Sequence, residues 1–412
     1  MTDEEPKAEI PQLLSPRLPV FLVDNNAELE KYIEVLSKAN VLAIDAERAS
    51  GFRYGQKAYL IQVALEDVGI YLLDTVPNYD ETLANNLRTQ INSKTWIIHA
   101  ASQDIPCLSE YGFHPVKILD TELAGRLLGY PKVSLGVLCE QLLGFSLAKE
   151  HSAVDWSERP LPQAWLNYAA LDVDVLFELW SQVDLALGKA NKKEIAEEEF
   201  EFLTKPLVKE PKIDRWRSVT GIHEIKDQRQ LTIVRALWQA REELAREKDV
   251  SPGRLVPDQS LVAAVKASPR SKSELASLRS FSGRASRTYL DLWWAAYEKG
   301  NQTHDLAELR VKSTGIPNHR NWPSKFPEAN IRLQWAKRLL KGQSEKLEIP
   351  VENLITPEIV RTICFSPEEF ELNPSQYLKS RLVRNWQIDE VVPVLLEAVA
   401  KSDLPPAEET TA

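Results

Sequence analysis

Hydrophobic residues in the first half of the chain follow two alternating patterns. Short apolar runs bounded by polar residues, VLAI at 41–44 and TWII at 95–98, predict buried β-strands. In residues 161–183 the apolar residues instead recur at helical spacing, with Pro162 near the start, which predicts an amphipathic helix. Alternating strands and helices are typical of α/β domains. We therefore expect an α/β domain in this half.

After about Gln228 the pattern becomes wholly helical. Residues 229–250 predict one long helix with an apolar stripe that includes Leu231, Val234 and Leu237. Further helices are predicted at roughly 258–267, 271–280 and 282–300. The chain after the α/β domain is therefore expected to form all-α helical bundles.

A weak internal repeat spans this helical region. Residues 247–265 align with residues 346–364 at an offset of 99, so that Val250 matches Ile349 and Leu255 matches Leu354. Both segments carry a helix, a proline-containing turn and a second helix. Because internal similarity indicates repeated architecture, residues 325–401 are predicted to be a degenerate second copy of the first helical bundle. Chance similarity between two helical bundles is the alternative.

Two acidic residues follow the apolar run at 41–44. Side chains two positions apart share one face of a strand, so Asp45 and Glu47 point the same way. Like charges on one face repel, and at the end of a buried strand they favour a cation between them. The alternative is a strand end that reaches solvent, with both carboxylates hydrated.

A third acid, Asp104, follows the run at 95–98 and stands near a strand-to-helix junction, where catalytic side chains of α/β domains gather. The alternative is an acid that complements the positive end of a helix. His99 stands at the end of the same strand, where a structural hydrogen bond is favoured over metal ligation.

The helix predicted at 161–183 carries a tyrosine and an acid one turn apart. Tyr168 and Asp172 are at positions i and i+4 and share a face, so the hydroxyl can orient a water beside a metal-bound carboxylate. The alternative is that Tyr168 packs in the core and Asp172 is solvated. Asp174 lies off that face and is expected at the surface.

Together, Asp-x-Glu on a strand, an aspartate at a later junction and Tyr-x-x-x-Asp on a helix resemble the exonuclease motifs of the DEDD superfamily, in its tyrosine-type branch. The segments YLIQVAL, IIHAASQD, DTELAGRLLG, SLGVLCEQLLG, VDWSERPL and YAALDVDVL resemble ribonuclease D from about Val20 to about Trp180. Residues 237–275 resemble the helicase-and-ribonuclease-D C-terminal (HRDC) domain. The resemblance implies a ribonuclease H-like mixed sheet flanked by helices, followed by helical bundles.

Proline-rich and polar stretches, together with these resemblances, predict seven segments. They are a disordered tail at 1–19, an exonuclease domain at 20–205, a linker at 206–224, an HRDC domain at 225–305, a linker at 306–324, the second HRDC-like domain at 325–401 and a disordered tail at 402–412.

The resemblance also implies chemistry: removal of nucleotides one at a time from the 3′ end of RNA, with two divalent metal ions about 4 Å apart. Carboxylate oxygens suit Mg²⁺ or Mn²⁺. Asp45 is expected to touch both metals, and Asp104 to complete one site. Glu47 and Asp172 are expected to hold the ion that carries the water, which Tyr168 orients.

The net charge of −10 is distributed unevenly, and residues 211–320 carry +7. Phosphate contacts are expected to concentrate there, although a solvated surface explains the same count. We expect the partner to be RNA with a free 3′ end, such as a tRNA precursor. Basic side chains expected to contact it include Lys149, His151 and Arg159 in a loop that could close over the terminal nucleotide, together with His99, Lys266, Arg270, Lys272, Arg279, Arg284 and Arg287.

Composition favours a cytoplasmic enzyme. The three cysteines, Cys107, Cys139 and Cys364, fit neither a disulfide framework nor zinc-ligand spacing. The acidic N-terminus lacks an apolar core typical of a signal peptide, and no apolar run is long enough to span a membrane. No glycine-rich phosphate loop is present, so no nucleotide cofactor is expected.

Two other functions remain open from the sequence. The same motifs and the same helical module occur with DNA substrates, so a DNA 3′-to-5′ exonuclease acting in repair is one alternative. A non-catalytic RNA-binding protein is the other, and it is disfavoured by the intact set of carboxylates.

Overall fold

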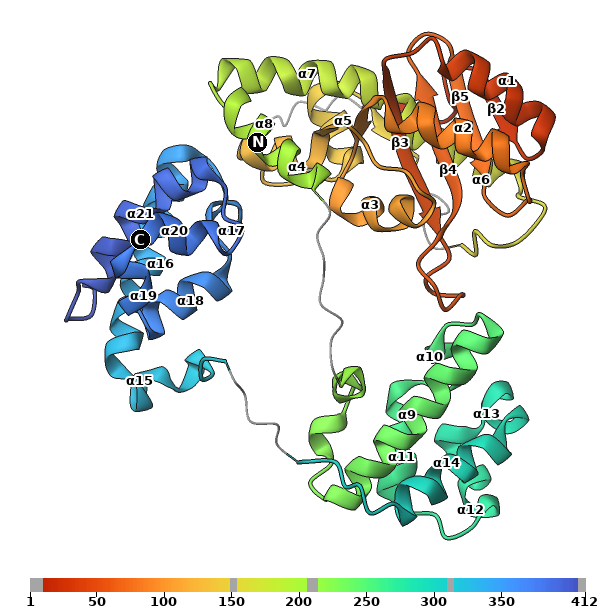
Figure 1. Cartoon of the computed structure of the whole chain (residues 1–412), viewed down its shortest axis with the longest axis vertical. Coiled ribbons are helices and arrows are strands. Elements are labelled where there is room, and N and C mark those ends of the chain that lie inside the picture. The colour runs from red at the N-terminus through yellow and green to blue at the C-terminus, as the bar shows by residue number, and fades with distance from the viewer. Residues whose placement is uncertain (1–9, 149–153, 206–213, 310–314, 407–412) are drawn as a thin grey trace, which may run out of the picture.

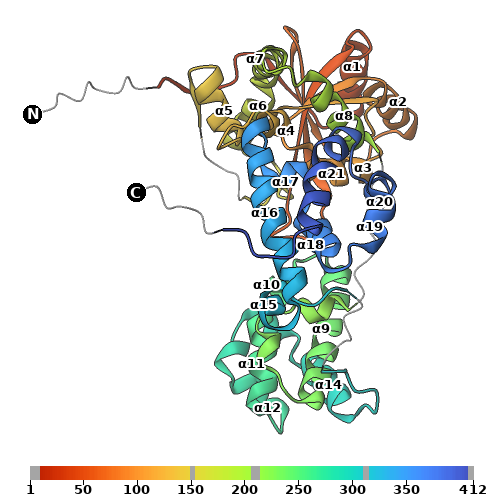
Figure 2. The same cartoon turned by 90° about the vertical axis from the view of Figure 1, so that its left-hand side faces the viewer.

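The computed structural model describes residues 10–148, 154–205, 214–309 and 315–406, which form three parts (Figure 1). The sheet domain comprises the described residues up to 205. The first helical module comprises residues 214–309, and the second helical module comprises residues 315–406. In Figure 2 the second helical module faces the viewer.

Six strands form the central sheet in the order β2-β5-β4-β3-β6-β7. β4 lies antiparallel to its neighbours β3 and β5, and the other adjacent strands run parallel. The strands are β2 Val20–Val23, β3 Val41–Arg48, β4 Ala58–Leu65, β5 Gly69–Asp74, β6 Thr95–Ile98 and β7 Lys117–Asp120. This mixed sheet, with flanking helices and helical modules after it, confirms the predicted fold class.

Helices cover both faces of the sheet because its central strands are apolar on both sides; every residue of β4 and β5 is buried. Leu42 and Ile44 of β3 belong to the core under the first two helices, whereas Ala43 belongs to the opposite core. Because side chains alternate along a strand, Asp45 and Glu47 share the face of Ala43. The helices are α1 Asn26–Leu36, α2 Glu81–Asn92, α3 Ala101–Glu110, α4 Thr121–Leu127, α5 Leu135–Leu142, α6 Gln163–Asp174, α7 Leu176–Lys189 and α8 Lys193–Thr204.

The single helix predicted at 161–183 is two helices, because α6 ends at Asp174 and α7 begins at Leu176. Leu166 and Val173 on one side of the break, and Leu179 on the other, are buried in the same core. Both helices therefore keep helical apolar spacing, which explains why the sequence pattern runs through the break without marking it.

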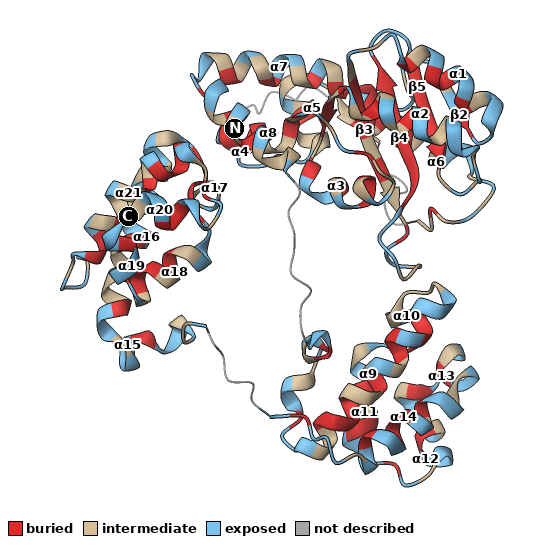
Figure 3. Ribbon diagram, viewed as in Figure 1, coloured by how far each residue is buried: buried red, intermediate tan, exposed pale blue. Residues whose placement is uncertain are grey.

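The first helical module is built on one long helix, as predicted. α9 Gln228–Lys248 packs lengthwise against α14 Leu290–Gln302, and Gly300 allows the close approach because a Cβ there would lie 2.7 Å from the Cα of Ile233. Trp293 is fully buried, and Trp294 stacks on Tyr297 with ring centroids 5.5 Å apart. The shorter helices are α10 Pro252–Leu255, α11 Asp258–Ala267, α12 Lys272–Ser277 and α13 Arg284–Thr288. Buried residues are spread along α9, α11 and α14, whose apolar sides form the core of this module (Figure 3).

The second helical module repeats these elements at the offset of 99 found in the sequence. α16 Pro327–Leu347, α17 Val351–Leu354 and α18 Pro357–Phe365 begin 99 positions after α9, α10 and α11 respectively. The residues that end the two long helices, Asp249 and Glu348, both adopt the left-handed conformation. Four further helices are α15 Trp322–Lys325, α19 Glu368–Leu372, α20 Pro374–Lys379 and α21 Asn385–Val399.

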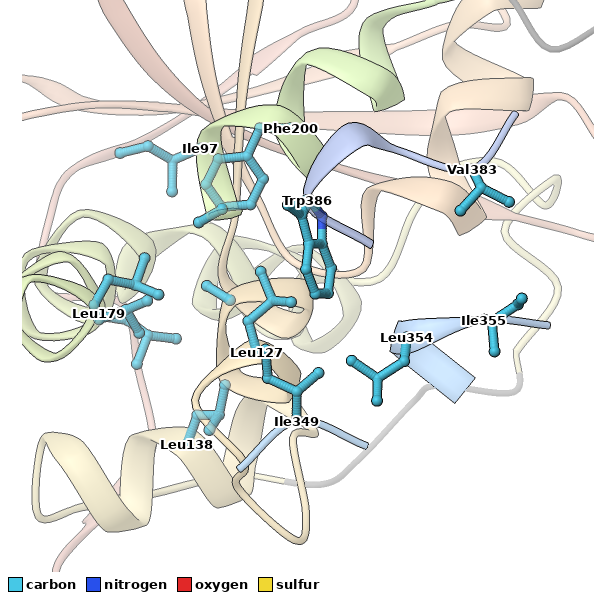
Figure 4. Packing of buried hydrophobic residues seen from close by; sticks show 14 of the residues in the cluster. Ile97, Leu127, Leu138, Leu179, Phe200, Ile349, Leu354, Ile355, Val383 and Trp386 are labelled. Carbon is cyan, nitrogen blue, oxygen red and sulfur yellow. The ribbon is translucent and has the colours of Figure 1, made fainter. Parts of the chain in front are cut away.

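The second helical module shares one continuous apolar core with the sheet domain. Figure 4 shows Trp386, Leu354 and Ile349 of the module beside Leu127 and Phe200 of the sheet domain. Polar contacts fix the interface: Glu199 accepts hydrogen bonds from the indole of Trp386 at 2.8 Å and the guanidinium of Arg384 at 2.6 Å.

The backbones of the two parts also meet closely. Gly129, at φ +78°, has the carbonyl oxygen of Glu348 2.6 Å from where a Cβ would lie. Lys192 donates to that carbonyl at 3.2 Å and to the carbonyl of Leu127 at 2.8 Å. A side chain at position 129 would therefore push the module away.

The first helical module meets the sheet domain at the loop between β3 and β4. The carboxylate of Asp249 accepts from the backbone N–H of Tyr54 at 3.3 Å, and the N–H of Ser251 donates to the carbonyl of Phe52 at 2.9 Å. The guanidinium of Arg254 lies 3.9 Å from the ring centroid of Phe52. Asp249 and Glu348 occupy equivalent positions of the repeat, so both modules contact the sheet domain through the end of their long helix.

The N-terminal segment predicted to be disordered at 1–19 is ordered in its described part. β1 Gln12–Leu13 pairs in parallel with β8 Ser146–Leu147. Arg17 forms an ion pair with Asp174 at 2.8 Å. The prediction that Asp174 lies at the surface is wrong, because this side chain is buried and its Oδ2 accepts a hydrogen bond from Arg17.

The predicted linkers and C-terminal tail are shorter than expected. Trp216, inside 206–224, is buried in the first module, and Trp322, inside 306–324, is buried in the second. The carbonyls of Asp403 and Pro406 accept hydrogen bonds from Trp335 and Arg338. No helix among the described residues is long and apolar enough to cross a membrane.

Candidate active site

Asp45 and Glu47 lie where β3 extends beyond its neighbour. β6 pairs with β3 only from Val41 to Ala43, so the two acids are free of that neighbour. On the other side, the pairing with β4 shifts register between Glu47 and Arg48. Both side chains are partly exposed although the strand before them is buried. They share one face of β3, as the spacing predicts.

α6 brings the third acid to these two. Each of Asp45, Glu47 and Asp172 has a carboxylate oxygen that lies within 4.8 Å of one from each of the others. α6 packs against β3 and β4 through its buried Leu166, Ala169 and Ala170. Tyr168, one turn before Asp172, lines the same cavity.

Asp104 completes the acidic group from the first turn of α3. Its carboxyl lines the same cavity as that of Asp45, and the two acids perturb each other's pKa. Arg48 lies 3.4 Å from the Asp104 carboxylate and donates to the carbonyl of Gln103 at 3.0 Å. The four carboxylates named from the sequence are therefore neighbours, although they come from three separate elements.

The turn that aims α3 at the site is held by Asp120 on β7. Ala100 adopts φ +61° and ψ +48°, a left-handed conformation that strains a residue with a Cβ. The carboxylate of Asp120 accepts the N–H of Ala100 at 3.0 Å and that of Ala101 at 2.9 Å. These bonds offset the strain and orient the first turn, which carries Asp104.

Crowding and burial favour the protonated form of these acids. Burial and then the charges of Asp45, Asp172 and Asp104 raise the pKa of Glu47 to about 9. Burial and then Asp45 raise the pKa of Asp104 to about 8. Burial also raises the pKa of Asp45, and it raises that of Asp172 well above its ordinary value.

The group fits a divalent cation. A cavity of about 260 Å³ is lined by the four carboxylates together with Arg48, His99 and Tyr168. Burial and mutual repulsion keep these carboxyls protonated. A cation that enters the cavity supplies positive charge that stabilises their ionised form. The donors are oxygens, which Mg²⁺ and Mn²⁺ prefer, and none of the described cysteines lines the cavity.

Family models match three consecutive regions of the chain. Residues 20–187 match a 3′-5′ exonuclease domain, residues 230–297 match the HRDC domain, and residues 315–399 match a 3′ to 5′ exonuclease C-terminal domain. Ribonuclease D of Shewanella sp. is 30% identical over 288 residues, which cover 68% of this chain and 72% of the relative. The chain belongs to the ribonuclease D family.

Two further comparisons agree. Ribonuclease D of Bartonella henselae is 27% identical over 346 residues, covering 83% of this chain and 81% of the relative. The crystal structure of ribonuclease D from Escherichia coli shares the fold, with a TM-score of 0.66 at 21% identity over 93% of this chain and 99% of that one. As a member of this family, the chain is a hydrolytic 3′-to-5′ exoribonuclease.

His99 lies between the acidic cavity of this ribonuclease D and a neighbouring one. The neighbouring cavity, of about 650 Å³, is bounded by sheet-domain residues and by Pro350 and Glu352 of the second helical module. Burial lowers the pKa of His99 to about 4, so the imidazole is neutral at pH 7. Its Nδ1 lies 2.9 Å from Thr121 Oγ1, which is the structural hydrogen bond expected from the sequence.

Arg159 does not line the acidic cavity, and its guanidinium is bound within the sheet domain, so its expected contact with nucleic acid stays a prediction. Nε and Nη2 donate to both oxygens of Asp74 at 2.5 and 2.6 Å. The remaining donors bond the carbonyls of Trp156, Glu158 and Tyr59. All five N–H groups of the guanidinium are thereby used, so none remains for a phosphate.

The other basic residues expected to bind RNA lie on the first helical module or outside the described residues. Lys149 and His151 belong to the latter group. Lys266 pairs with Glu224 at 2.6 Å, and Lys272 pairs with Asp291. Arg279, Arg284 and Arg287 are exposed. These residues lie on the elements from α11 to α13, whereas the module meets the sheet domain through residues 242–254 (Figure 1).

Sequence reasoning missed two residues of the site, Arg48 and Asp120. Arg48 directly follows the Asp-x-Glu pair, and a cation next to a predicted metal site was the available signal. Asp120 begins the segment DTELAGRLLG, where an aspartate before a helical pattern indicates an N-cap. It does cap α4, and its second role, at Ala100 and Ala101, depends on a strand-to-strand contact that no local pattern reveals.

Proposed function

We propose that this ribonuclease D shortens structured RNA, such as the 3′ extension of a tRNA precursor, one nucleotide at a time with two divalent metal ions. The observation that carries the proposal is the convergence of Asp45, Glu47, Asp104 and Asp172 from three elements on one cavity. The second helical module also supports the proposal. Its Pro350 and Glu352 line the adjoining cavity, through which an RNA strand can reach the acids.

The residues of the site have separate roles in hydrolysis. When bound, the metal ions supply positive charge that activates the attacking water and stabilises the departing oxygen. Glu47 and Asp172 would hold the ion that carries the water, Asp104 would complete the second site, and Asp45 would contact both ions. The water attacks phosphorus, the bond to the 3′ oxygen of the preceding nucleotide breaks, and a nucleoside 5′-monophosphate leaves.

Tyr168 orients the water in this scheme. Burial and the negative charges of Asp172, Glu47 and Asp45 raise the pKa of its hydroxyl, so it keeps its proton throughout the usual pH range. A protonated hydroxyl donates a hydrogen bond and does not act as a base.

Replacing Tyr168 with phenylalanine is expected to lower kcat by about 10- to 100-fold and to leave KM nearly unchanged, because the ring remains and only the orienting hydroxyl is lost. Steady-state release of nucleotide from a short RNA measures this. Tyr377→Phe, in α20 and outside both cavities, is the matched control and should retain wild-type kcat. A Tyr168→Phe enzyme with unaltered kcat would remove the orienting role.

Binding of Mg²⁺ is expected to release protons at neutral pH. The pKa values of Glu47, about 9, and Asp104, about 8, mean that both hold protons at pH 7 without metal. A cation must displace them, so affinity should rise between pH 6 and 9 by up to about tenfold per pH unit for each proton released. Titration calorimetry in two buffers of different ionisation enthalpy counts the protons. Release of none at pH 7 would contradict the raised pKa values.

The substrate proposal is tested with a 5′-labelled tRNA precursor that carries a 3′ extension. In Mg²⁺ we expect a ladder that shortens from the 3′ end and stops at the folded body, and no ladder in EDTA. An all-deoxyribose strand of the extension sequence, run in parallel, tests the DNA alternative. Equal rates on ribose and deoxyribose strands would favour that alternative, and shortening of a single strand but not of the precursor would refute the structured-RNA proposal.

A further inference from the structure

Each helical module has a groove at the same place, between its long helix and the short helices that follow. The groove of the first module has a volume of about 440 Å³ and is lined by Trp238, Arg241, Glu242, Pro252 and Asp258, among others. The groove of the second has about 390 Å³ and is lined by Lys337, Leu340, Lys341, Val351 and Pro357 at the corresponding positions, 99 residues later.

The charged side chains that line the groove of the first module are paired with one another or with their neighbours in the module. Arg241 forms an ion pair with Asp258 at 2.8 Å, and the Arg241 side chain is only 4% exposed. Arg215 lies 3.8 Å from the carboxylate of Glu242, and its guanidinium carbon lies 5.9 Å from the ring centroid of Trp238. Opposite charges within the module therefore neutralise one another.

The second module has lost these pairs. The positions of Arg241 and Asp258 are taken by Leu340 and Pro357, so an ion pair is replaced by apolar surface. The position of Glu242 is taken by Lys341, which reverses the charge. The floor is buried and aliphatic, and consists of Leu333, Leu340, Ile355 and Val360.

Only basic groups stand at the edge of this second groove. His319, Lys337, Lys341 and Arg361 line it, and none of the described residues that line it is acidic. Lys337 and Lys341 are exposed on α16, one turn apart, while Arg361 approaches from α18. An apolar floor of this size fits one large hydrophobic side chain, and the edge attracts carboxylates beside it.

We propose that this groove binds an acidic peptide segment of a partner protein, with one apolar side chain in the floor and flanking carboxylates at Lys337 and Arg361. A nucleic acid fits less well, because the aliphatic floor offers no hydrogen-bond partner to a base edge. A peptide with apolar anchors uses such a floor fully. The proposal concerns a surface separate from the acidic cavity and does not depend on the catalytic assignment.

The test is fluorescence anisotropy of the full-length protein with the labelled peptide DDLFEE. We expect saturable binding with a Kd on the order of 100 µM, and at least about tenfold weaker binding of DDSSEE, which keeps the charge but lacks the apolar anchors. The double variant Lys337→Glu, Arg361→Glu should weaken DDLFEE about tenfold or more, since two attractions become repulsions.

The matched control is Lys346→Glu, on the same helix but outside the groove, which should bind DDLFEE as the wild type does. The double variant should also keep wild-type exonuclease rates on a short RNA, which shows that the chain is folded. Absence of DDLFEE binding up to about 1 mM would overturn the proposal, as would equal binding by the double variant. Binding of octauridylate in EDTA that the double variant loses, without binding of DDLFEE, would assign the groove to RNA instead.

Discussion

Asp45→Asn is expected to lower the rate of nucleotide release from RNA by about 10³-fold or more in saturating Mg²⁺. Asp45 is the central acid of the site, with Glu47, Asp104 and Asp172 all around it. Asparagine keeps the shape of the side chain but removes the charge that holds a cation. Single-turnover release of nucleotide from a 5′-labelled RNA measures the loss.

The same substitution should leave the fold intact. Burial raises the pKa of Asp45 above its unfolded value, so ionisation of this carboxyl in the metal-free protein opposes folding as the pH rises through the folded pKa. Asparagine does not ionise, and the metal-free variant should therefore unfold at an equal or higher temperature than the wild type at neutral pH.

Asp67→Asn is the matched control, because Asp67 lies on an exposed turn at φ +56°, a conformation that asparagine tolerates well. It should retain full activity. An Asp45→Asn enzyme that releases nucleotides at more than about a tenth of the wild-type rate would show that hydrolysis does not depend on this acid.

Arg159→Ala is expected to destabilise the sheet domain by about 3–5 kcal/mol, because it leaves the buried carboxylate of Asp74 without its partner. Three carbonyls lose their hydrogen bonds as well. The unfolding temperature should fall by about 10 °C, while KM for a short RNA, measured well below that temperature, should not change.

Arg270→Ala, which removes an exposed arginine of the first module, is the stability control and should shift the unfolding temperature by no more than about 1 °C. The double variant Asp74→Ala, Arg159→Ala should lose less stability than the sum of the two single variants. A stable Arg159→Ala enzyme with a raised KM would instead support the RNA contact predicted from the sequence.

The acids of the site were predictable because each obeys a local rule. Asp45 and Glu47 are two positions apart on a strand, which places them on one face. Tyr168 and Asp172 are four positions apart on a helix, which also places them on one face. The offset of 99 was visible because both copies keep the same apolar spacing around a proline turn. The expected roles of the individual acids toward two metals stay predictions.

Contacts between distant segments were not predictable in this way. Arg159 is polar and lies in a polar loop, so its local pattern is the same whether it meets a phosphate or the carboxylate of Asp74, 85 positions earlier. Asp174 was expected at the surface because its partner, Arg17, is 157 positions away in a segment that has the composition of a disordered tail. Only the tertiary fold distinguishes these alternatives.

The contact between the second module and the sheet domain was also not predictable from local sequence patterns. Glu199 lies in an acidic run, yet its carboxylate is buried against Trp386 and Arg384 of the second module. The run KKEIAEEEFEF therefore combines solvated acids with two, Glu198 and Glu199, that bond the second module, and nothing in the spacing separates them.

The most direct test of the central claim is an anomalous-scattering map of crystals grown with Mn²⁺ and a short RNA whose terminal linkage resists hydrolysis. The account predicts two manganese peaks about 4 Å apart, in contact with Asp45, Glu47, Asp104 and Asp172, with the terminal phosphate beside them. A map with no manganese at these four carboxylates, while the RNA is bound, would contradict it.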